Sequence, residues 1–498
     1  MSRRFSITVT AGMLGISAII GFTASGPAGA ATSPFPPLTA LRVDRSVSPP
    51  AVVDAAGRQT LLRGVNVSSL GDYWQANRRY PTVVPMTGAD WDRIAAQGFD
   101  SVRLLVSWSR LEPRRDRFDR AYLDRIRAAV AAARARGIYT ILDMHQDAWG
   151  KYVATPRGTS CPEGTEPAKG WDGAPRWATL TGGLSTCTPG AREASPAAQE
   201  AWRAFYANDR GIRDELVEAW GFLARSFRTE AAIAGYDLLN EPNHGTDDAF
   251  RSGLAEFYGE AIAAIRRAER PAGSVDHMIF IEPTIYGQDP FPIRFPTVMT
   301  EDNIVFAPHN YGDSITSIPV EGLFDYFQSI ATRADTPLWI GEYGWFDVSA
   351  RNTAALGRYA AKEDALLVAG SSWWQWRQAC GDPHSIGYDG AEPNDQVHFQ
   401  RNGCPGDVNG GVVAEWACAS RAYPMRSPGR LTALSSDCTT GTMIATGTTA
   451  RPGTLVAWYP GRVRPAAAAD GSRIARVRGG YVVSIPVRGD YSVTLRRP

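Results

Sequence analysis

The sequence predicts an α/β fold, a (β/α)8 barrel followed by a small C-terminal β-sandwich. Three observations support this prediction. Eight short apolar runs alternate with helical segments between residues 61 and 376, and polar or aromatic residues follow each run. Beyond about residue 423 the pattern changes to short alternating segments separated by Gly and Pro turns, and separate strands are expected at 442–446, 454–459, 473–477, 481–486 and 491–495. The length of 498 residues suits one barrel-sized domain and a smaller second one.

The expected barrel strands are apolar runs, and polar, ionisable or aromatic residues stand at or just after their ends. The runs cover residues 61–66, 102–107, 139–144, 233–239, 278–281, 304–307, 338–341 and 371–376. Amphipathic helices are expected between several of them, as at 121–136 and 249–270. A doubly wound sheet is the alternative. It would not gather polar residues after nearly every strand, so we favour the barrel.

The N-terminus is typical of an export signal, which predicts a secreted protein. Arg3 and Arg4 precede an apolar stretch, and Ala-Gly-Ala at 28–30 is a small-residue cleavage pattern. An uncleaved membrane anchor is the alternative. We therefore divide the chain into a signal peptide (1–30), an N-terminal extension with a β-hairpin (31–60), a barrel (61–422) and a β-sandwich (423–498). The hairpin is expected to close the bottom of the barrel. The sandwich is expected to be structural, with binding of carbohydrate or membrane as the alternative.

The composition excludes some classes of partner. The formal net charge is +1, so no bulk field attracts nucleic acid or an anionic membrane. An even number of cysteines in an exported chain predicts three disulfides, and we expect local pairing: Cys161 with Cys187, Cys380 with Cys404, and Cys418 with Cys438. The cysteine and histidine spacing fits no metal site. We expect a monomer without metal or organic cofactor.

Polar groups that follow the strands of a barrel converge on one pocket. Among them are three glutamates, Glu241, Glu282 and Glu342, each directly after an expected strand. Glycoside hydrolysis requires two carboxyl groups, one to protonate the leaving oxygen and one to attack the sugar or to activate water. The sequence pattern therefore indicates a glycosidase, but the residues alone do not choose the pair. Asn240, beside Glu241, is placed to bind a sugar hydroxyl.

Two motifs resemble those of a known enzyme family. Asn-Glu-Pro at 240–242 after the fourth strand, with Ile-Gly-Glu-Tyr-Gly at 340–344 after the seventh, resembles glycoside hydrolase family 5. Arg103, His145, His309, Tyr311 and a tryptophan of the eighth strand also match that family's pattern. The resemblance implies retaining chemistry, with Glu241 as acid/base and Glu342 as nucleophile. Glu282 then becomes a polar wall residue.

The same resemblance implies roles for the neighbours. Arg103 would keep Glu342 ionised, Tyr311 would hydrogen-bond it, and Asn240 would bind the sugar 2-hydroxyl. His145 and His309 would position sugar or carboxylates; buried structural histidines are the alternative. Trp374 would stack under the sugar, with Trp373 and Trp376 as alternatives, because an error of one residue in register changes the face.

A narrower resemblance concerns the substrate. Residues 143–147 (Asp-Met-His-Gln-Asp), residues 174–178 (Ala-Pro-Arg-Trp-Ala) and the C-terminal sandwich resemble the endoglycoceramidases and endogalactosylceramidases of actinobacteria. This implies a secreted retaining endo-β-glycosidase that cleaves oligosaccharide from ceramide in glycosphingolipids. Asp147 and Trp177 would contact the sugar next to the cleaved bond. Gln146 and the loop 71–74 are weaker candidates.

Two readings compete with this one. A β-glucanase or exo-β-glucosidase would act on polysaccharide or small β-glycosides. A glycan-binding protein on a degenerate barrel would lack the two glutamates that this chain keeps.

A ceramide substrate needs an apolar surface, and the protein would meet it at a membrane or micelle surface. Two segments are candidates for this surface. One holds Phe291, Ile293 and Phe295 between prolines, which favours an exposed lip. The other spans residues 323–327 and includes Leu323, Phe324, Tyr326 and Phe327; ordinary packing of a barrel helix is the alternative there.

Overall fold

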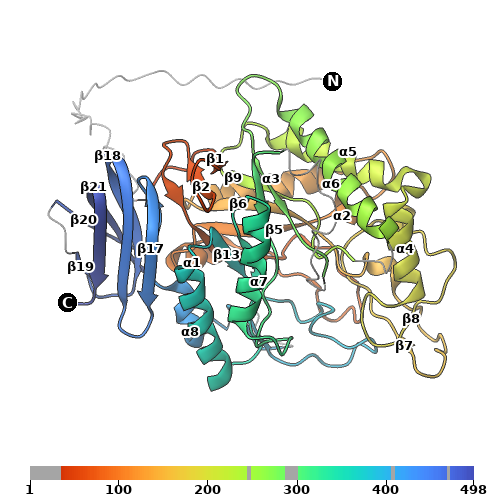
Figure 1. Cartoon of the computed structure of the whole chain (residues 1–498). Coiled ribbons are helices and arrows are strands. Elements are labelled where there is room, and N and C mark those ends of the chain that lie inside the picture. The colour runs from red at the N-terminus through yellow and green to blue at the C-terminus, as the bar shows by residue number, and fades with distance from the viewer. Residues whose placement is uncertain (1–34, 244–247, 286–300, 405–409, 468–470) are drawn as a thin grey trace, which may run out of the picture. The chain divides into compact units, whose positions relative to one another are not determined.

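A computed structural model describes residues 35–243, 248–285, 301–404, 410–467 and 471–498. Residues 35–498 form one compact unit (Figure 1). The expected signal peptide and the expected lip residues Phe291, Ile293 and Phe295 lie outside the described residues.

The central element is an eight-stranded parallel sheet in the order β11-β10-β9-β6-β5-β4-β13-β12. The strands are β4 (Leu62–Val67), β5 (Ser101–Ser107), β6 (Tyr139–His145), β9 (Ile233–Asp237), β10 (Met278–Ile281), β11 (Ile304–Phe306), β12 (Ile340–Tyr343) and β13 (Gly370–Trp373). Parallel bridges from Phe306 to Leu338 and from His309 to Glu342 join the two ends of this order. The sheet therefore curls into the barrel that the sequence predicts.

Every residue of these eight strands is buried, which explains why the strands are near-continuous apolar runs rather than alternating ones. Helices cover the outer side, and several begin at a side-chain cap, as at Asp119, Ser195 and Ser349. The helices are α1 (Gly88–Ala96), α2 (Trp108–Leu111), α3 (Arg120–Arg134), α4 (Pro196–Tyr206), α5 (Ile212–Phe227), α6 (Asp248–Glu269), α7 (Val320–Arg333) and α8 (Ala350–Ala365).

The expected N-terminal hairpin closes the bottom of the barrel. β1 (Leu41–Asp44) pairs antiparallel with β2 (Ala51–Asp54). Leu41, Val43 and Val52 share one apolar cluster with side chains from seven barrel strands or strand starts, among them Tyr139 and Trp339. The hairpin therefore excludes water from the barrel interior at the end opposite the carboxyl ends of the strands.

The C-terminal residues form an antiparallel sheet in which long strands replace several short ones. β18 (Thr442–Pro460) and β21 (Gly480–Arg496) each span two segments that the sequence suggests as separate strands, and their ladder breaks between Thr449 and Gly453. β16 (Tyr423–Ser427), β17 (Arg430–Asp437), β19 (Ala466–Ala467) and β20 (Arg473–Val477) complete it. Residues from both sides of the break share one apolar core, as in a sandwich.

This sheet also takes in the N-terminal extension, which the sequence does not predict. β3 (Gln59–Thr60) pairs with β2 on one side and with β16 on the other. The hairpin under the barrel and the C-terminal strands are therefore one continuous sheet, β1-β2-β3-β16-β18-β21-β19. In Figure 1 the hairpin and the C-terminal strands lie on the same side of the barrel.

The three disulfides follow the expected local pairing: Cys161–Cys187, Cys380–Cys404 and Cys418–Cys438. The first closes the long segment between β6 and α4, which holds the short elements η1 (Lys151–Val153), β7 (Glu166–Pro167), η2 (Arg176–Ala178) and β8 (Cys187–Thr188). The second closes a segment after β13 that contains β14 (Gln396–Val397). Further elements are β15 (Arg401–Asn402), η3 (Asp209–Gly211) and η4 (Ala414–Ser420).

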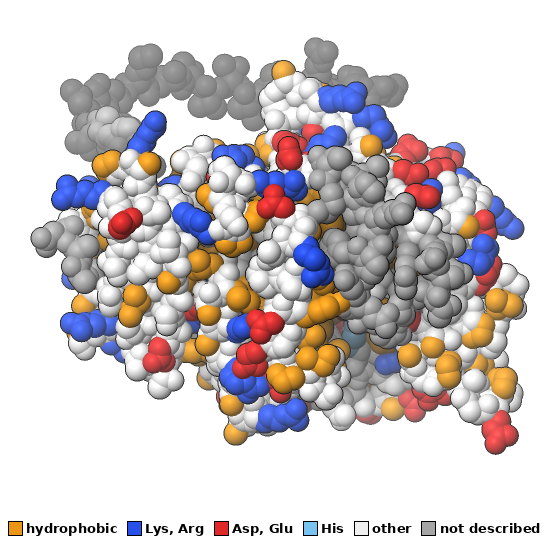
Figure 2. Space-filling view, in the orientation of Figure 1, with side chains coloured by type: hydrophobic (Ala, Val, Ile, Leu, Met, Phe, Trp, Pro, Cys, Tyr) orange, Lys and Arg blue, Asp and Glu red, His pale blue; other side chains and the backbone are white. Residues whose placement is uncertain are grey.

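The segment 323–327 does not form an exposed apolar lip. It lies in α7, where Phe324 and Phe327 are buried and Leu323 and Tyr326 are half-buried against the main core. The helix packs these side chains toward the barrel, for instance Phe327 against Phe306. On the face shown in Figure 2, basic and acidic side chains of the described residues are interspersed. Within the described ranges, no helix is both long and apolar enough to cross a bilayer.

Candidate active site

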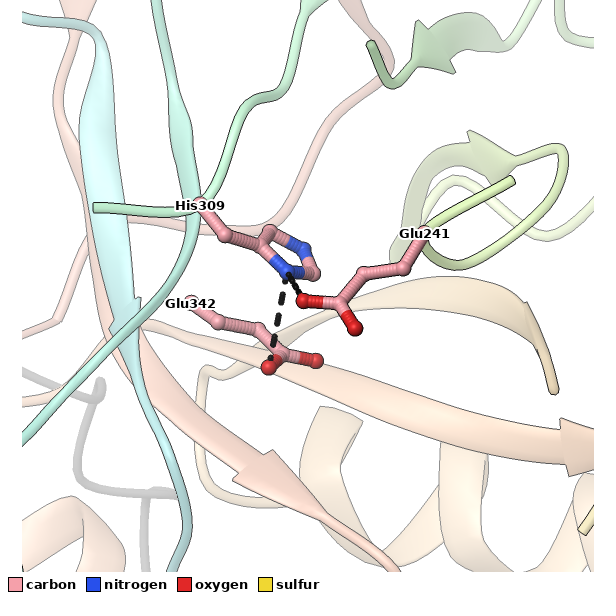
Figure 3. A group of neighbouring side chains, drawn as sticks. All are labelled: Glu241, His309 and Glu342. Atoms are coloured by element: carbon pink, nitrogen blue, oxygen red, sulfur yellow. Dashed lines mark hydrogen bonds and ion pairs between the residues drawn. The ribbon is translucent and has the colours of Figure 1, made fainter. Parts of the chain in front are cut away.

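Three ionisable side chains meet at the carboxyl ends of the barrel strands, from segments far apart in the sequence. Glu241 follows β9, His309 follows β11 and Glu342 lies in β12 (Figure 3). One oxygen of each glutamate and one ring nitrogen of the histidine all lie within 4.8 Å of one another. Glu241 has a positive φ of 38°, a conformation that non-glycine residues rarely adopt and that is common at functional sites.

Arg103 organises this cluster from the middle of β5. Its guanidinium is fully buried and donates to Asp237 (2.7 Å), to Glu282 (2.7 Å) and to Glu342 (2.7 Å). It also donates to the side-chain oxygens of Asn66 (3.1 Å) and Asn240 (2.9 Å). One buried cation thus compensates several carboxylates, and their attraction raises the pKa of Arg103 although burial opposes it.

Glu342 accepts two strong hydrogen bonds. Arg103 donates to one carboxylate oxygen at 2.7 Å, and the hydroxyl of Tyr311 donates to the other at 2.8 Å. Burial, with the nearby charge of Glu241, raises the pKa of Glu342, while His309 and Arg103 act to lower it. The two donors fix both oxygens, so the orientation of this carboxylate is set before any ligand arrives.

Glu241 lies in a different environment. One oxygen pairs with Nδ1 of His309 at 2.9 Å, and Arg192 donates to the other. The backbone N–H of Glu241 donates to Glu282 at 2.8 Å. Burial alone would raise the pKa of Glu241, but Arg192 and His309 outweigh it and lower this pKa to about 2.

Two clusters of ionisable side chains near Arg103 have the spacing of a cation site. One is Glu241 and Glu342 with His309; the other is Asp143, Asp237 and Glu282. Arg103 lies against both, because its guanidinium contacts Glu342 and all three carboxylates of the second group. The arginine therefore supplies the positive charge that a metal ion would otherwise provide.

The rings of His145 and Trp374 form a flat aromatic surface beside the two glutamates. Their rings stack with centroids 5.5 Å apart and an interplanar angle of 15°. Nδ1 of His145 lies 2.8 Å from Asp143, and Nε2 lies 3.6 Å from Asp147. Burial lowers the pKa of His145, but the two aspartates outweigh it and raise this pKa well above the ordinary value.

The geometry distinguishes the three tryptophans of the eighth strand. Trp374 clusters with Leu105 and Tyr311, and its ring also contacts His384. Trp373 points the other way, into the main core, against Trp345 and Trp416, and Trp376 packs on Phe399. Trp374 is therefore the one of the three that borders the carboxylates, and its stacking under the sugar stays a prediction.

The other expected sugar contacts are arranged as follows. Asp147 is buried and lies beside His145 and Arg192. Asn240 accepts from Arg103 and donates to the carbonyl of Gln146 at 2.9 Å. Gln146 supports the backbone, because its amide donates to the carbonyls of Asn240 (2.6 Å) and Glu241 (2.9 Å).

Trp177 lies in η2 and packs edge-on against Trp108. Its indole N–H donates to the carbonyl of Glu112 at 3.0 Å, and Arg115 lies over its ring. These contacts anchor Trp177 to the segment after β5, and the predicted sugar contact of this tryptophan stays a prediction.

Sequence reasoning missed Arg192, Asp237 and His384. Arg192 lies in an irregular segment between two short elements, where no periodicity or strand end marks it. Asp237 is the last residue of β9 and pairs with Arg103. It lies inside the expected strand 233–239, so reading only the residues after that run passed over it. His384 lies after the barrel, 3.9 Å from Asp147 and in ring contact with Trp171.

Comparisons with known proteins agree with this geometry. The profile of the family described as Cellulase (glycosyl hydrolase family 5) matches residues 53–379. The chain belongs to glycosyl hydrolase family 5. It is therefore a glycoside hydrolase, and the barrel and the family expected from the sequence are both confirmed.

Individual relatives of this family 5 enzyme carry narrower names. A crystal structure of an endogalactoceramidase is similar, with 40% identity and a TM-score of 0.83; the match covers 93% of this chain and 100% of that one. Endoglycoceramidase I of Rhodococcus hoagii is 29% identical over 381 residues, which is 70% of each chain. An endo-glycoceramidase II from Rhodococcus sp. shares the fold at 22% identity and a TM-score of 0.66, with 90% and 99% covered.

Proposed function

We propose that this family 5 enzyme is a retaining endo-β-glycosidase that releases oligosaccharide from the ceramide of glycosphingolipids. The match to an endogalactoceramidase at 40% identity along that entire chain carries the substrate assignment. Asp147, His145 and Trp374 supply polar and aromatic surface for the sugar beside the bond that is cleaved. The export-like N-terminus and the three disulfides support secretion, so that the enzyme meets its lipid outside the cell.

In this proposal Glu342 is the nucleophile and Glu241 the acid/base. Retaining enzymes hold their two carboxyl groups about 5–5.5 Å apart. The 4.8 Å limit on the nearest atoms of Glu241 and Glu342 supports this class over the wider spacing of inverting enzymes. Arg103 and Tyr311 aim Glu342, and Asn240 is placed for the sugar 2-hydroxyl.

The reaction then has two steps. An oxygen of Glu342 attacks the anomeric carbon as the bond to the ceramide oxygen breaks, and Glu241 gives that oxygen its proton. This leaves a glycosyl ester on Glu342 and free ceramide. Glu241, now ionised, takes a proton from water, whose oxygen attacks the same carbon and releases the sugar from Glu342 with its original anomeric configuration.

The substrate assignment predicts the products from two kinds of glycan. Incubated with mixed glycosphingolipids in detergent and, separately, with soluble β-glucans, the enzyme should release intact oligosaccharide and free ceramide only from the lipids. Mass spectrometry identifies the products, and NMR of the first-formed anomer checks retention. Glucan fragments without lipid cleavage would establish the β-glucanase alternative instead.

Substitutions of Trp373, at the end of β13, and of Trp374, directly after it, should have opposite effects. Trp374→Ala should raise KM about 10- to 100-fold, because removal of one stacking side chain costs about 1.5–3 kcal/mol of buried apolar contact. Trp373→Ala is the matched control. Trp373 is fully buried in the core, so its loss should lower the free energy of unfolding by about 3–5 kcal/mol. Steady-state kinetics and urea unfolding separate the two effects, and equal KM values in both variants would remove Trp374 from the sugar site.

A further inference from the structure

Arg192 links the two residues that the proposed reaction needs for different tasks. Its guanidinium donates to Asp147 with one nitrogen and to Glu241 with another. A third nitrogen donates to Glu193, and the group lies over the ring of Trp171, 5.3 Å from its centroid. The side chain is still 22% exposed, so it reaches the site from the solvent side.

The pairing of Arg192 with both Asp147 and Glu241 is incompatible with catalytic turnover while it persists. Glu241 must carry a proton to protonate the leaving oxygen, whereas a guanidinium stabilises the ionised carboxylate. Arg192 binds Oδ1 of Asp147, whereas Oδ2 lies 3.6 Å from Nε2 of His145. A sugar that uses both oxygens of Asp147 therefore competes with Arg192 for this carboxylate.

Every charged group around Glu241 must be considered to judge what Arg192 contributes. Negative charge comes from Asp147 after β6, Glu282 after β10 and Glu342 in β12, and Glu193 adjoins Arg192 itself. Positive charge comes from Arg192 and from His309. Arg103 lies behind this group and pairs with Glu282 and Glu342 rather than with Glu241. With Arg192 gone, His309 is the remaining cation in contact with Glu241 among the described residues, and it is shared with Glu282 and Glu342.

We propose that Arg192 is a positioning residue that holds Glu241 ionised in the empty site and leaves it when a sugar binds at Asp147. This proposal rests on the proposed function and adds a step to it. Substrate binding frees Glu241 from its cation, burial then favours the neutral carboxyl, and Glu241 takes up the proton that it later gives to the ceramide oxygen. The acid thus becomes competent only in the complex.

The pH dependence of two kinetic constants tests this step. The alkaline limb of kcat/KM reports the acid in the free enzyme, and that of kcat reports it in the complex. In Arg192→Gln we expect the alkaline limb of kcat/KM on lactosylceramide to move up by about 1–3 pH units, the effect of a nearby opposite charge. The limb of kcat should stay, because Arg192 has already left. Equal shifts in both constants, or none, would refute the proposal.

Three controls keep the result interpretable. Arg192→Lys keeps a cation and should keep the wild-type limbs. Arg203→Gln removes an arginine of α4 that also bridges two carboxylates, Glu200 and Asp209, and should change neither limb. With dinitrophenyl lactoside, whose leaving group needs no proton, the alkaline limb should be insensitive to Arg192. If the wild type cleaves no lipid of the glycosphingolipid mixture, the proposed function fails rather than this step.

A measurement without mutation covers the case in which Arg192→Gln does not fold. Calorimetry of the wild type with a thio-linked, uncleavable lactoside, in buffers of different ionisation enthalpy, counts the protons bound. We expect uptake approaching one proton per site near neutral pH. Binding without proton uptake would show that Glu241 stays ionised in the complex.

A second, independent observation concerns a cleft lined by Trp74, whose backbone N–H bonds to Trp171. It has a volume of about 660 Å³ and is lined by Tyr73, Trp74, Gln75, Arg78, Lys151, Tyr152, Ala154, Thr155, Pro156, Arg157 and Arg176. Four of these side chains are cationic and none is acidic. Only Lys151 is paired with a carboxylate within the described part of the chain, Asp72 at 2.6 Å. The positive charges of Arg78, Arg157 and Arg176 are therefore available to a ligand.

The cleft lies on the side of the site where the sugar contact of Asp147 is expected. Its walls come from the segments after β4 and β6, and Asp147 also follows β6. The backbone N–H of Trp74 donates to the carbonyl of Trp171, whose ring lies under Arg192. Trp74 and Tyr152 offer aromatic surface, with Arg176 lying 4.6 Å from the centroid of Tyr152.

We infer that this cleft binds a sugar that carries an anionic group, a carboxylate or a sulfate, at a distance from the cleaved bond. The test compares kcat/KM for sialylated, sulfated and neutral lactosyl lipids in wild type and in Arg78→Gln/Arg157→Gln. Both arginines are exposed, so the fold should survive. We expect the wild type to favour one or both acidic lipids by about three- to tenfold over the neutral lipid, as for a few exposed ion pairs, and the variant to lose this ratio. No preference in the wild type, or one that the variant keeps, would overturn the inference.

Discussion

Replacement of Glu342 by Gln should abolish hydrolysis and leave the protein folded. The amide cannot form the glycosyl ester, and loss of a nucleophile in enzymes with covalent intermediates lowers kcat by about 10⁴- to 10⁶-fold. The fold should survive because Arg103 keeps its contacts with Asp237, Glu282 and Asn240. Initial rates on lactosylceramide and thermal unfolding by circular dichroism measure both effects.

Glu282→Gln is the matched control, because Glu282 is equally buried and bonded to the same arginine. It should retain far more activity than Glu342→Gln. The smaller variant Glu342→Ala adds a positive signal, since azide can enter the vacated space, attack from the face of the lost carboxylate and give an α-glycosyl azide. A β-azide, or full activity in Glu342→Gln, would assign the nucleophile to another residue.

The sequence predicts the barrel and the cluster because both depend on local patterns. Each buried strand is a short apolar run, and each of Glu241, Glu342 and His309 stands directly at or after such a run. Parallel strands then bring these ends together without further information. The sequence does not decide which tryptophan borders the carboxylates, because a strand alternates its faces and an error of one residue in register exchanges Trp373 and Trp374.

What escapes sequence reasoning depends on contacts between distant segments. Arg192 reaches Glu241 only because the segment closed by Cys161–Cys187 folds back over the site. β3 joins β16 across more than 350 residues, from Thr60 to Arg426. The separate strands expected at 442–446 and 454–459 run on as one, since a break in the ladder replaces the expected turn. No local pattern encodes such pairings.

Substitution of Arg103 should have the second large effect, on stability as well as on activity. Arg103→Met should lower the free energy of unfolding by about 3–5 kcal/mol, because it leaves buried carboxylates without their cation. Asp237, Glu282 and Glu342 all lose a donor at 2.7 Å. The loss should shrink as pH falls, since protonation removes the unpaired charges, and grow toward neutral pH. Urea unfolding at two pH values measures it.

Arg478→Met is the control for removal of an arginine as such. Arg478 pairs with Asp92 at 3.0 Å, but its side chain is 68% exposed, and exposed pairs contribute about 0–1 kcal/mol. We therefore expect almost no change in this variant at either pH. If Arg103→Met were as stable as Arg478→Met, the carboxylates around Arg103 would have to be neutral in the folded enzyme. Another group would then have to keep the carboxylate of Glu342 ionised for its attack on the sugar. The roles of Glu342 as nucleophile and Glu241 as acid/base would have to be reassigned.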